Sequence, residues 1–169
     1  EERIVTRLSD GLAELGKGEA DTVVIAGMGG QLTVHILTCG EHALAEAEKL
    51  VLQPQSEIFL VRRYLADHGF RIVKETIVFE DGKYYPMMQV RHREEGGEAE
   101  AYSPAELEFG KHLIPECLPV WKDFLNREKA SCEKILESLR SGQGERIEER
   151  RNEISDRLAY IRESLGRSK

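Results

Sequence analysis

The chain has 169 residues, and its 24 Lys and Arg against 31 Asp and Glu give a formal net charge of −7. With 40% apolar and 33% charged residues, it is too apolar to be disordered and too charged to be a membrane protein. No stretch reaches the roughly 18 apolar residues of a membrane span or has the pattern of a signal peptide, and the acidic balance argues against a purely electrostatic nucleic-acid binder while leaving room for a local basic face.

The first predicted elements are a strand and a helix separated by glycines. The β-branched run Asp21–Ala26 ends at Gly27–Gly30, which is typical of a buried parallel strand. Apolar residues then recur at helical spacing over Gln31–Leu37. Upstream, the β-type run Ile4–Val5 lies close enough to Asp10–Gly11 for this pair to mark the end of an earlier strand.

A second strand and a second helix follow. The segment Lys49–Gln53 predicts a short buried strand that Pro54 stops. Ser56 is predicted to cap a helix that runs to about His68, and Gly69 closes this helix. Strand, helix, strand and helix joined by short links predict an α/β fold with a parallel sheet.

This sheet is expected to end in an antiparallel hairpin. Phe70–Phe79 is a β-rich run, Asp81–Gly82 favours a type I′ turn, and Tyr84–Val90 returns as the partner strand. The segment Arg91–Ala101 is charged, contains glycine and lacks periodicity, so we interpret it as a linker. The first domain is therefore predicted to span residues 1–101.

The remaining residues, 102–169, predict a domain of a different kind. Two stripes with alternating spacings of four and three residues run over 121–139 and 147–165, with a break at Ser141–Gly144. This pattern predicts an antiparallel, coiled-coil-like helical hairpin, in which Trp121 is expected to lie in the core. The alternative is one interrupted helix packed flat on the first domain.

Charge divides unevenly along the chain. Residues 1–102 carry 11 basic and 18 acidic side chains, so the whole net charge of −7 lies there, and residues 103–169 carry 13 of each. From Lys122 onward 12 basic side chains face 10 acidic ones, a net charge of +2. The second arm of the hairpin is rich in arginine, which fits either phosphate contacts or an ordinary solvated face. Its arginines are Arg146, Arg150, Arg151, Arg157, Arg162 and Arg167.

The cysteines and histidines predict neither a disulfide framework nor a metal site. The three cysteines, Cys39, Cys117 and Cys132, are odd in number and widely spaced, which favours a reducing cytoplasm. The five histidines include no pair at helical spacing with a glutamate between them. We therefore expect no bound metal.

Three polar or glycine-rich segments follow predicted strands: Ser9–Gly11, Gly27–Gly30 and Gln53–Gln55. In an open α/β sheet ligands bind beyond the carboxyl ends of the strands, so these segments together predict a binding site. The carboxylate of Asp10 could accept hydrogen bonds from a ribose or a nucleobase amine, and the glycines let a ligand approach the backbone. Each segment alone also fits an ordinary turn, and the sequence contains neither a G-x-G-x-x-G fingerprint nor a P-loop.

Four stretches together resemble one protein family. They are D-G-L at Asp10–Leu12, K-G-E-A-D-T-V-V-I-A-G-M-G-G at Lys17–Gly30, L-V-L-Q-P-Q at Leu50–Gln55 and E-D-G-K-Y-Y at Glu80–Tyr85. This pattern is similar to that of the bacterial tRNA (adenine(22)-N1)-methyltransferase family, which uses S-adenosyl-L-methionine. The resemblance covers nearly the whole chain.

The resemblance implies a Rossmann-like methyltransferase sheet, of which this chain holds the C-terminal part, followed by a helical-hairpin domain that helps to hold tRNA. The implied cofactor-binding residues are Asp10, Gly11, Ala26, Gly27, Met28 and Gly30. The implied catalytic residues are Gly27, Met28, Gly29, Gln53 and Gln55. Backbone carbonyls and the two glutamine amides are expected to stabilise the positive charge that reaches the adenine as its N1 is methylated.

One feature departs from the family pattern. The family's first motif, an acidic residue followed by a glycine-containing turn, would precede Glu1. Because this motif is absent and the chain does not begin with Met, we expect a fragment or a truncated relative that binds S-adenosyl-L-methionine poorly or not at all by itself. The expected partner is tRNA in the cytoplasm, without membrane or metal, and with a monomer as one option for the oligomeric state. The alternatives are an α/β nucleotide-binding fold with another substrate, or an interaction module that acts through its helical hairpin.

Overall fold

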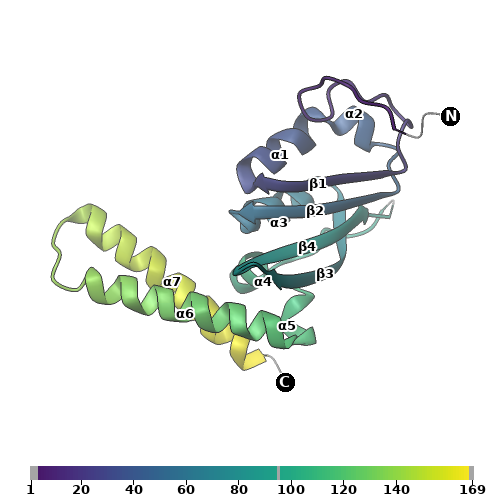
Figure 1. The fold of residues 1–169 in the computed structure, drawn as a ribbon. Helices are drawn as coiled ribbons and strands as arrows, with labels where there is room; N and C mark the ends of the chain where they lie inside the picture. Colours follow the sequence, from purple (N-terminus) through teal and green to yellow (C-terminus); the bar gives the residue numbers. More distant parts are fainter. Residues whose placement is uncertain (1–3, 95, 168–169) are drawn as a thin grey trace. The chain divides into compact units, whose positions relative to one another are not determined.

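Figure 1 shows the computed structural model of the chain, which describes residues 4–94 and 96–167. The chain forms two units by its internal contacts. One unit runs through Thr76 and includes Tyr85–Ala101, and the other combines Ile77–Tyr84 with the chain from Tyr102 on. The first unit holds most of the sheet, and the second holds the tip of a β-hairpin together with the long helices.

The elements of the described residues follow one another as β1 (Thr22–Gly29), α1 (Gly30–Cys39), α2 (Glu41–Leu44), β2 (Lys49–Ser56), α3 (Ile58–Asp67), β3 (Phe70–Glu80), β4 (Lys83–His92), α4 (Pro104–Phe109), α5 (Leu113–Glu116), α6 (Pro119–Ser138) and α7 (Glu145–Arg167). The sheet has the order β1-β2-β4-β3, in which β1 and β2 are parallel and β2 and β4 are antiparallel. The predicted α/β class, a parallel sheet that ends in a hairpin, is confirmed.

Strand β1 is buried on one face only, so the expectation of a fully buried strand is wrong. Val23 and Ile25 are 5% and 7% exposed, whereas Val24 between them is 65% exposed. Successive side chains of a strand point to opposite faces of the sheet. Helices α1 and α3 pack against each other (Figure 1), so both cover the same face of the sheet and leave Val24 on the other.

Two predicted boundaries after β2 are also wrong. The strand continues through Pro54 to Ser56, because Pro54 pairs with Met28 at an irregularity of the register, where a missing N–H is tolerated. Ser56 is therefore part of the strand, and Glu57 is the N-cap of α3 instead. The end of α3 is as expected, since Gly69 follows it with a φ of +78°.

The hairpin between β3 and β4 has the predicted turn. Asp81 and Gly82 both have positive φ, +48° and +79°, as a type I′ turn requires. The right-handed twist of such a turn matches that of the flanking strands, so a two-residue connection suffices.

The second unit is built on an antiparallel pair of helices, α6 and α7, that pack along each other (Figure 1). This confirms the predicted helical hairpin over the single interrupted helix. Trp121 is fully buried, as expected, and its Nε1 donates to the carbonyl of Phe109 at 3.1 Å. The short helix α4 was not predicted, although Ser103 and Glu106 form a capping box at its start. None of the helices in the described ranges is both long enough and apolar enough to cross a membrane.

An ion pair lies inside the first unit. The Nε atom of Arg62 on α3 is 2.8 Å from Oε1 of Glu75 on β3, and both side chains are almost completely buried. Two charges removed from water are stable only when they are paired with good geometry. This pair therefore fixes α3 to the strand beneath it.

We expect Glu75→Ala to lower the free energy of unfolding by about 3–5 kcal/mol, because the buried guanidinium of Arg62 loses this carboxylate. Urea unfolding followed by circular dichroism measures the change. The control is Glu46→Ala, which removes an exposed ion pair with Lys17 in the same unit and should cost less than about 1 kcal/mol. Equal losses in the two variants would contradict the assignment.

Candidate functional site

The carboxyl ends of β1 and β2 are both irregular. Ala26 pairs with Gln53, Met28 with Pro54, and Gly29 with Ser56. Gly27 is therefore an extra residue on β1, and Gln55 is an extra residue on β2. Such bulges change the direction in which side chains point and occur often beside active sites. Two of the residues predicted from the sequence are thus the two bulged positions.

Gly27 connects the two strand ends. Its φ of +78° favours glycine, and its N–H donates to Oε1 of Gln53 at 2.9 Å. A Cβ atom at Gly27 would meet no described heavy atom within 4 Å, so there is open space against this backbone. The Nε2 atom of Gln53 is buried and has no hydrogen-bond partner among the described residues. A buried donor of this kind fits a ligand acceptor.

Gly30 allows the start of α1 to approach the loop after β2. A Cβ atom there would lie 2.7 Å from the carbonyl oxygen of Ser56 and still closer to that of Glu57. Thr33 on α1 further fixes the turn, because its Oγ1 donates to the carbonyl of Gly29 at 3.0 Å. The glycine turn and the loop after β2 therefore form one corner of the first unit.

A second contact across this corner was not predicted from the sequence. The Nε2 atom of Gln31 donates to Oε1 of Glu57 at 2.7 Å. Glu57 has a φ of +48°, in the left-handed region that residues with a Cβ rarely adopt. The sequence did offer one signal, because Glu57 lies two residues beyond the predicted Gln53–Gln55 segment.

The third predicted segment, Ser9–Gly11, lies in the loop before β1 and packs against α1 away from this corner. Residues 4–9, all of which the structure describes, form no strand, so the expected earlier strand is wrong. A strand needs the backbone groups of a neighbouring strand, whereas these residues are held by side-chain contacts of a loop. Gly11 has a φ of +56° and packs beside Ile36. Ile36 is six residues beyond Gly30, or about 9 Å along the helix axis.

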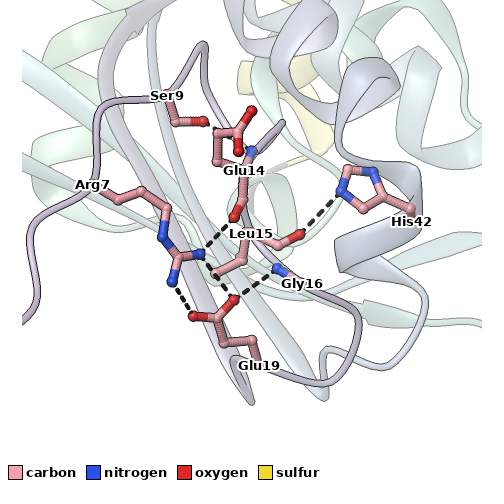
Figure 2. Close-up of polar contacts among 7 residues, drawn as sticks. All are labelled: Arg7, Ser9, Glu14, Leu15, Gly16, Glu19 and His42. Atoms are coloured by element: carbon pink, nitrogen blue, oxygen red, sulfur yellow. Dashed lines mark hydrogen bonds and ion pairs between the residues drawn. The ribbon is translucent and has the colours of Figure 1, made fainter.

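Figure 2 shows how this loop is held. Arg7 forms two hydrogen bonds with the carboxylate of Glu19, at 2.9 and 2.5 Å, and a third with the carbonyl of Glu14. The same carboxylate accepts the N–H of Gly16 at 2.7 Å. On the other side of the loop, Nε2 of His42 lies 3.0 Å from the carbonyl of Leu15. A hollow of about 360 Å³ opens beside these contacts. Its lining is Val5, Arg7, Ser9, Gly11, Leu12, Leu15 and Glu19.

The hydrogen bond from Arg7, and after it the one from the backbone of Gly16, lowers the pKa of Glu19 to about 2. Because the pKa is lowered on folding, the stabilisation is present above the usual value near 4.5 and is lost as the pH falls towards 2. We expect the loop around Arg7 to loosen over this pH range.

A carboxyl-carbon NMR titration of Glu19 should give its pKa, and the protection factor of the Gly16 amide against hydrogen exchange should fall as this group is protonated. In Glu19→Gln the protection factor of Gly16 should not change over this pH range. A pKa near 4.5 for Glu19 would contradict the bidentate contact.

The arginine-rich helix α7 is largely neutralised within its own unit. Arg157 pairs with Glu128 at 2.8 Å and also with Glu108. Carboxylates also lie beside Arg150, Arg151, Arg162 and Arg167. An ordinary solvated face with internal ion pairs therefore explains most of this run. No group of three metal-ligating side chains occurs in the ranges that the structure describes.

We expect Gly30→Ala to perturb the corner far more than Gly27→Ala does. The first Cβ meets backbone carbonyls, an overpacking that costs roughly 1–3 kcal/mol and displaces the loop after β2. The second Cβ enters open space and costs only the left-handed conformation, about 1 kcal/mol. Thermal unfolding and the amide NMR shifts of Ser56 and Glu57 distinguish the two, and larger shifts in Gly27→Ala would contradict the geometry.

Comparison with known proteins shows the family of this chain. The sequence profile of the family described as tRNA (adenine(22)-N(1))-methyltransferase matches residues 1–163. The Bacillus subtilis (strain 168) protein of that name is 32% identical over 170 residues, which cover 96% of this chain and 69% of the relative.

Two solved structures have the same fold. The crystal structure of the B. subtilis m1A22 tRNA methyltransferase TrmK has a TM-score of 0.82 at 30% identity and covers 94% of this chain and 69% of that one. A Streptococcus pneumoniae protein in complex with S-adenosyl-L-methionine has a TM-score of 0.79 at 33% identity, with 94% and 67% covered. The profile match over nearly the whole sequence, together with these relatives, shows that the chain belongs to the tRNA (adenine(22)-N(1))-methyltransferase family.

Proposed function

We propose that this chain transfers a methyl group from S-adenosyl-L-methionine to N1 of an adenine in tRNA. The observation that carries the proposal is the family match over residues 1–163, which includes both bulged strand ends. The B. subtilis relative is named for this reaction, and the S. pneumoniae structure contains this cofactor.

Two features of the strand ends support a site for the cofactor and the base. Open space lies against the backbone of Gly27, and the Nε2 donor of Gln53 is buried beside it. S-adenosyl-L-methionine, when bound, supplies a methyl group activated by a positively charged sulfur. The residues proposed to hold it are Asp10, Gly11, Ala26, Gly27, Met28 and Gly30.

The proposed catalytic residues are Gly27, Met28, Gly29, Gln53 and Gln55, and their main task is alignment. The N1 lone pair of adenine is already nucleophilic, so a fixed orientation supplies most of the rate. Positive charge then passes to the base, and oxygen acceptors would stabilise it. The Oε1 atom of Gln53 already accepts the N–H of Gly27. The exposed side chain of Gln55 and the backbone carbonyls of the turn therefore remain as acceptors.

The two predicted domains have separate tasks in this proposal. Residues 1–101 carry the strand ends, and residues 102–169 help to hold the tRNA. To contact tRNA phosphates, the arginines of α7 would have to exchange the carboxylates with which they now pair. Contacts between arginines and phosphates release counterions, so we expect tRNA binding to weaken steeply as the salt concentration rises. The target adenine, which lies in a folded RNA, would have to swing out of its stack. With tRNA as the substrate, we propose the cytoplasm as its location.

The test is methyl transfer by this chain to a tRNA transcript with adenine at position 22. At saturating radiolabelled S-adenosyl-L-methionine we expect label in this transcript and 1-methyladenosine in its digest, detected by mass spectrometry. Gly27→Val should abolish the transfer, because its side chain fills the open space at the turn.

The matched control is the same transcript with guanine at position 22, which should stay unlabelled. Calorimetry measures cofactor affinity separately, since we expect it to be weak for this chain alone. Retained tRNA binding without methyl transfer would favour the alternative, an interaction module that acts through the helical hairpin.

A further inference from the structure

Glu57 has a backbone conformation that its place in the fold does not require. Among the described residues three non-glycine residues have positive φ: Glu57, Asp81 and Cys117. Asp81 lies in a type I′ turn, and Cys117 ends a helix in the left-handed conformation common there. Glu57 instead begins α3, where N-cap residues are usually extended, and its side chain caps no backbone N–H within the described part of this helix. Strained residues of this kind cluster at functional sites.

The side chain of Glu57 is held in a defined direction. Its Oε1 accepts the hydrogen bond from Gln31 at 2.7 Å, and its backbone carbonyl packs against Gly30. The residue is exposed, and it lies at the same sheet edge as the bulged residues Gly27 and Gln55. A carboxylate is ionised at neutral pH. The corner therefore presents a fixed negative charge where the sheet ends.

A negative charge at this position would stabilise the product of adenine N1-methylation. As N1 forms its bond to the methyl carbon and the sulfur–carbon bond breaks, a neutral thioether leaves and the positive charge passes to the base. The exocyclic N6 amine of adenine is a hydrogen-bond donor, whereas guanine has an O6 acceptor at the same place. A carboxylate opposite this position attracts adenine, stabilises its methylated cation and repels guanine.

We propose that the carboxylate of Glu57 accepts a hydrogen bond from the N6 amine of the target adenine, and that it is a specificity-determining residue held in place by Gln31. This inference rests on the proposed function. It supplies a negatively charged acceptor, which the neutral amides of Gln53 and Gln55 are not.

The test is a titration of the ¹⁵N-labelled chain with adenosine, guanosine and 1-methyladenosine, whose ring is cationic at neutral pH. We expect amide shifts at Gly27, Gly29 and Gly30, with 1-methyladenosine bound about tenfold more tightly than adenosine, because its ring carries a positive charge that the carboxylate attracts. Guanosine should bind more weakly than adenosine. In Glu57→Gln, which can keep the hydrogen bond from Gln31, the preference for the cation should disappear.

Glu48→Gln is the control, because Glu48 is an exposed glutamate just before the opposite end of β2, and it should retain the preference. Glu57→Asp, which keeps the charge, should retain part of it, and unchanged circular dichroism shows that each variant folds. Absence of a preference in the unaltered chain, or an unchanged preference in Glu57→Gln, would overturn the proposal. Because these are binding measurements, they can succeed or fail independently of methyl transfer to tRNA.

Discussion

Because β1 and β2 are parallel, their carboxyl ends lie side by side at one end of the sheet. The glycine turn and the loop after Pro54 therefore meet there. The two bulges shift the register there, and the hydrogen bond from Gly27 to Gln53 adds a side-chain contact between the paired strand ends. The close approach of α1 to the following loop depends on the missing Cβ of Gly30. The contacts of Gln31 with Glu57 and of Thr33 with Gly29 are built on that pairing.

Local patterns were sufficient to predict most of the fold. The β-branched run before Gly27, the turn at Asp81–Gly82 and the two heptad stripes each specify a conformation over a few residues. Their order then leaves few topologies, because parallel strands need a helical crossover and antiparallel strands need only a turn. Trp121 was assigned to the core for the same local reason, since it continues a helical stripe.

The errors and omissions arise where distant parts of the chain decide the outcome. Ile4–Val5 has strand-forming residues, but a strand exists only when a neighbour pairs with it. The bulges at Gly27 and Gln55 depend on how two strands align. The direction of the Glu57 side chain depends on a hydrogen bond from Gln31, 26 residues away. Arg157 of α7 is similarly paired with carboxylates on other helices, Glu108 and Glu128.

The tip of the hairpin, Ile77–Tyr84, belongs to the unit of the long helices, although 17 residues (Tyr85–Ala101) return the chain to the other unit before those helices begin. Ile77 is 3% exposed in the core that contains Phe109 and Trp121. The boundary between the two units is therefore discontinuous in the sequence, and the chain crosses it three times. No single cut in the chain separates the two units, so neither can be excised as one uninterrupted segment.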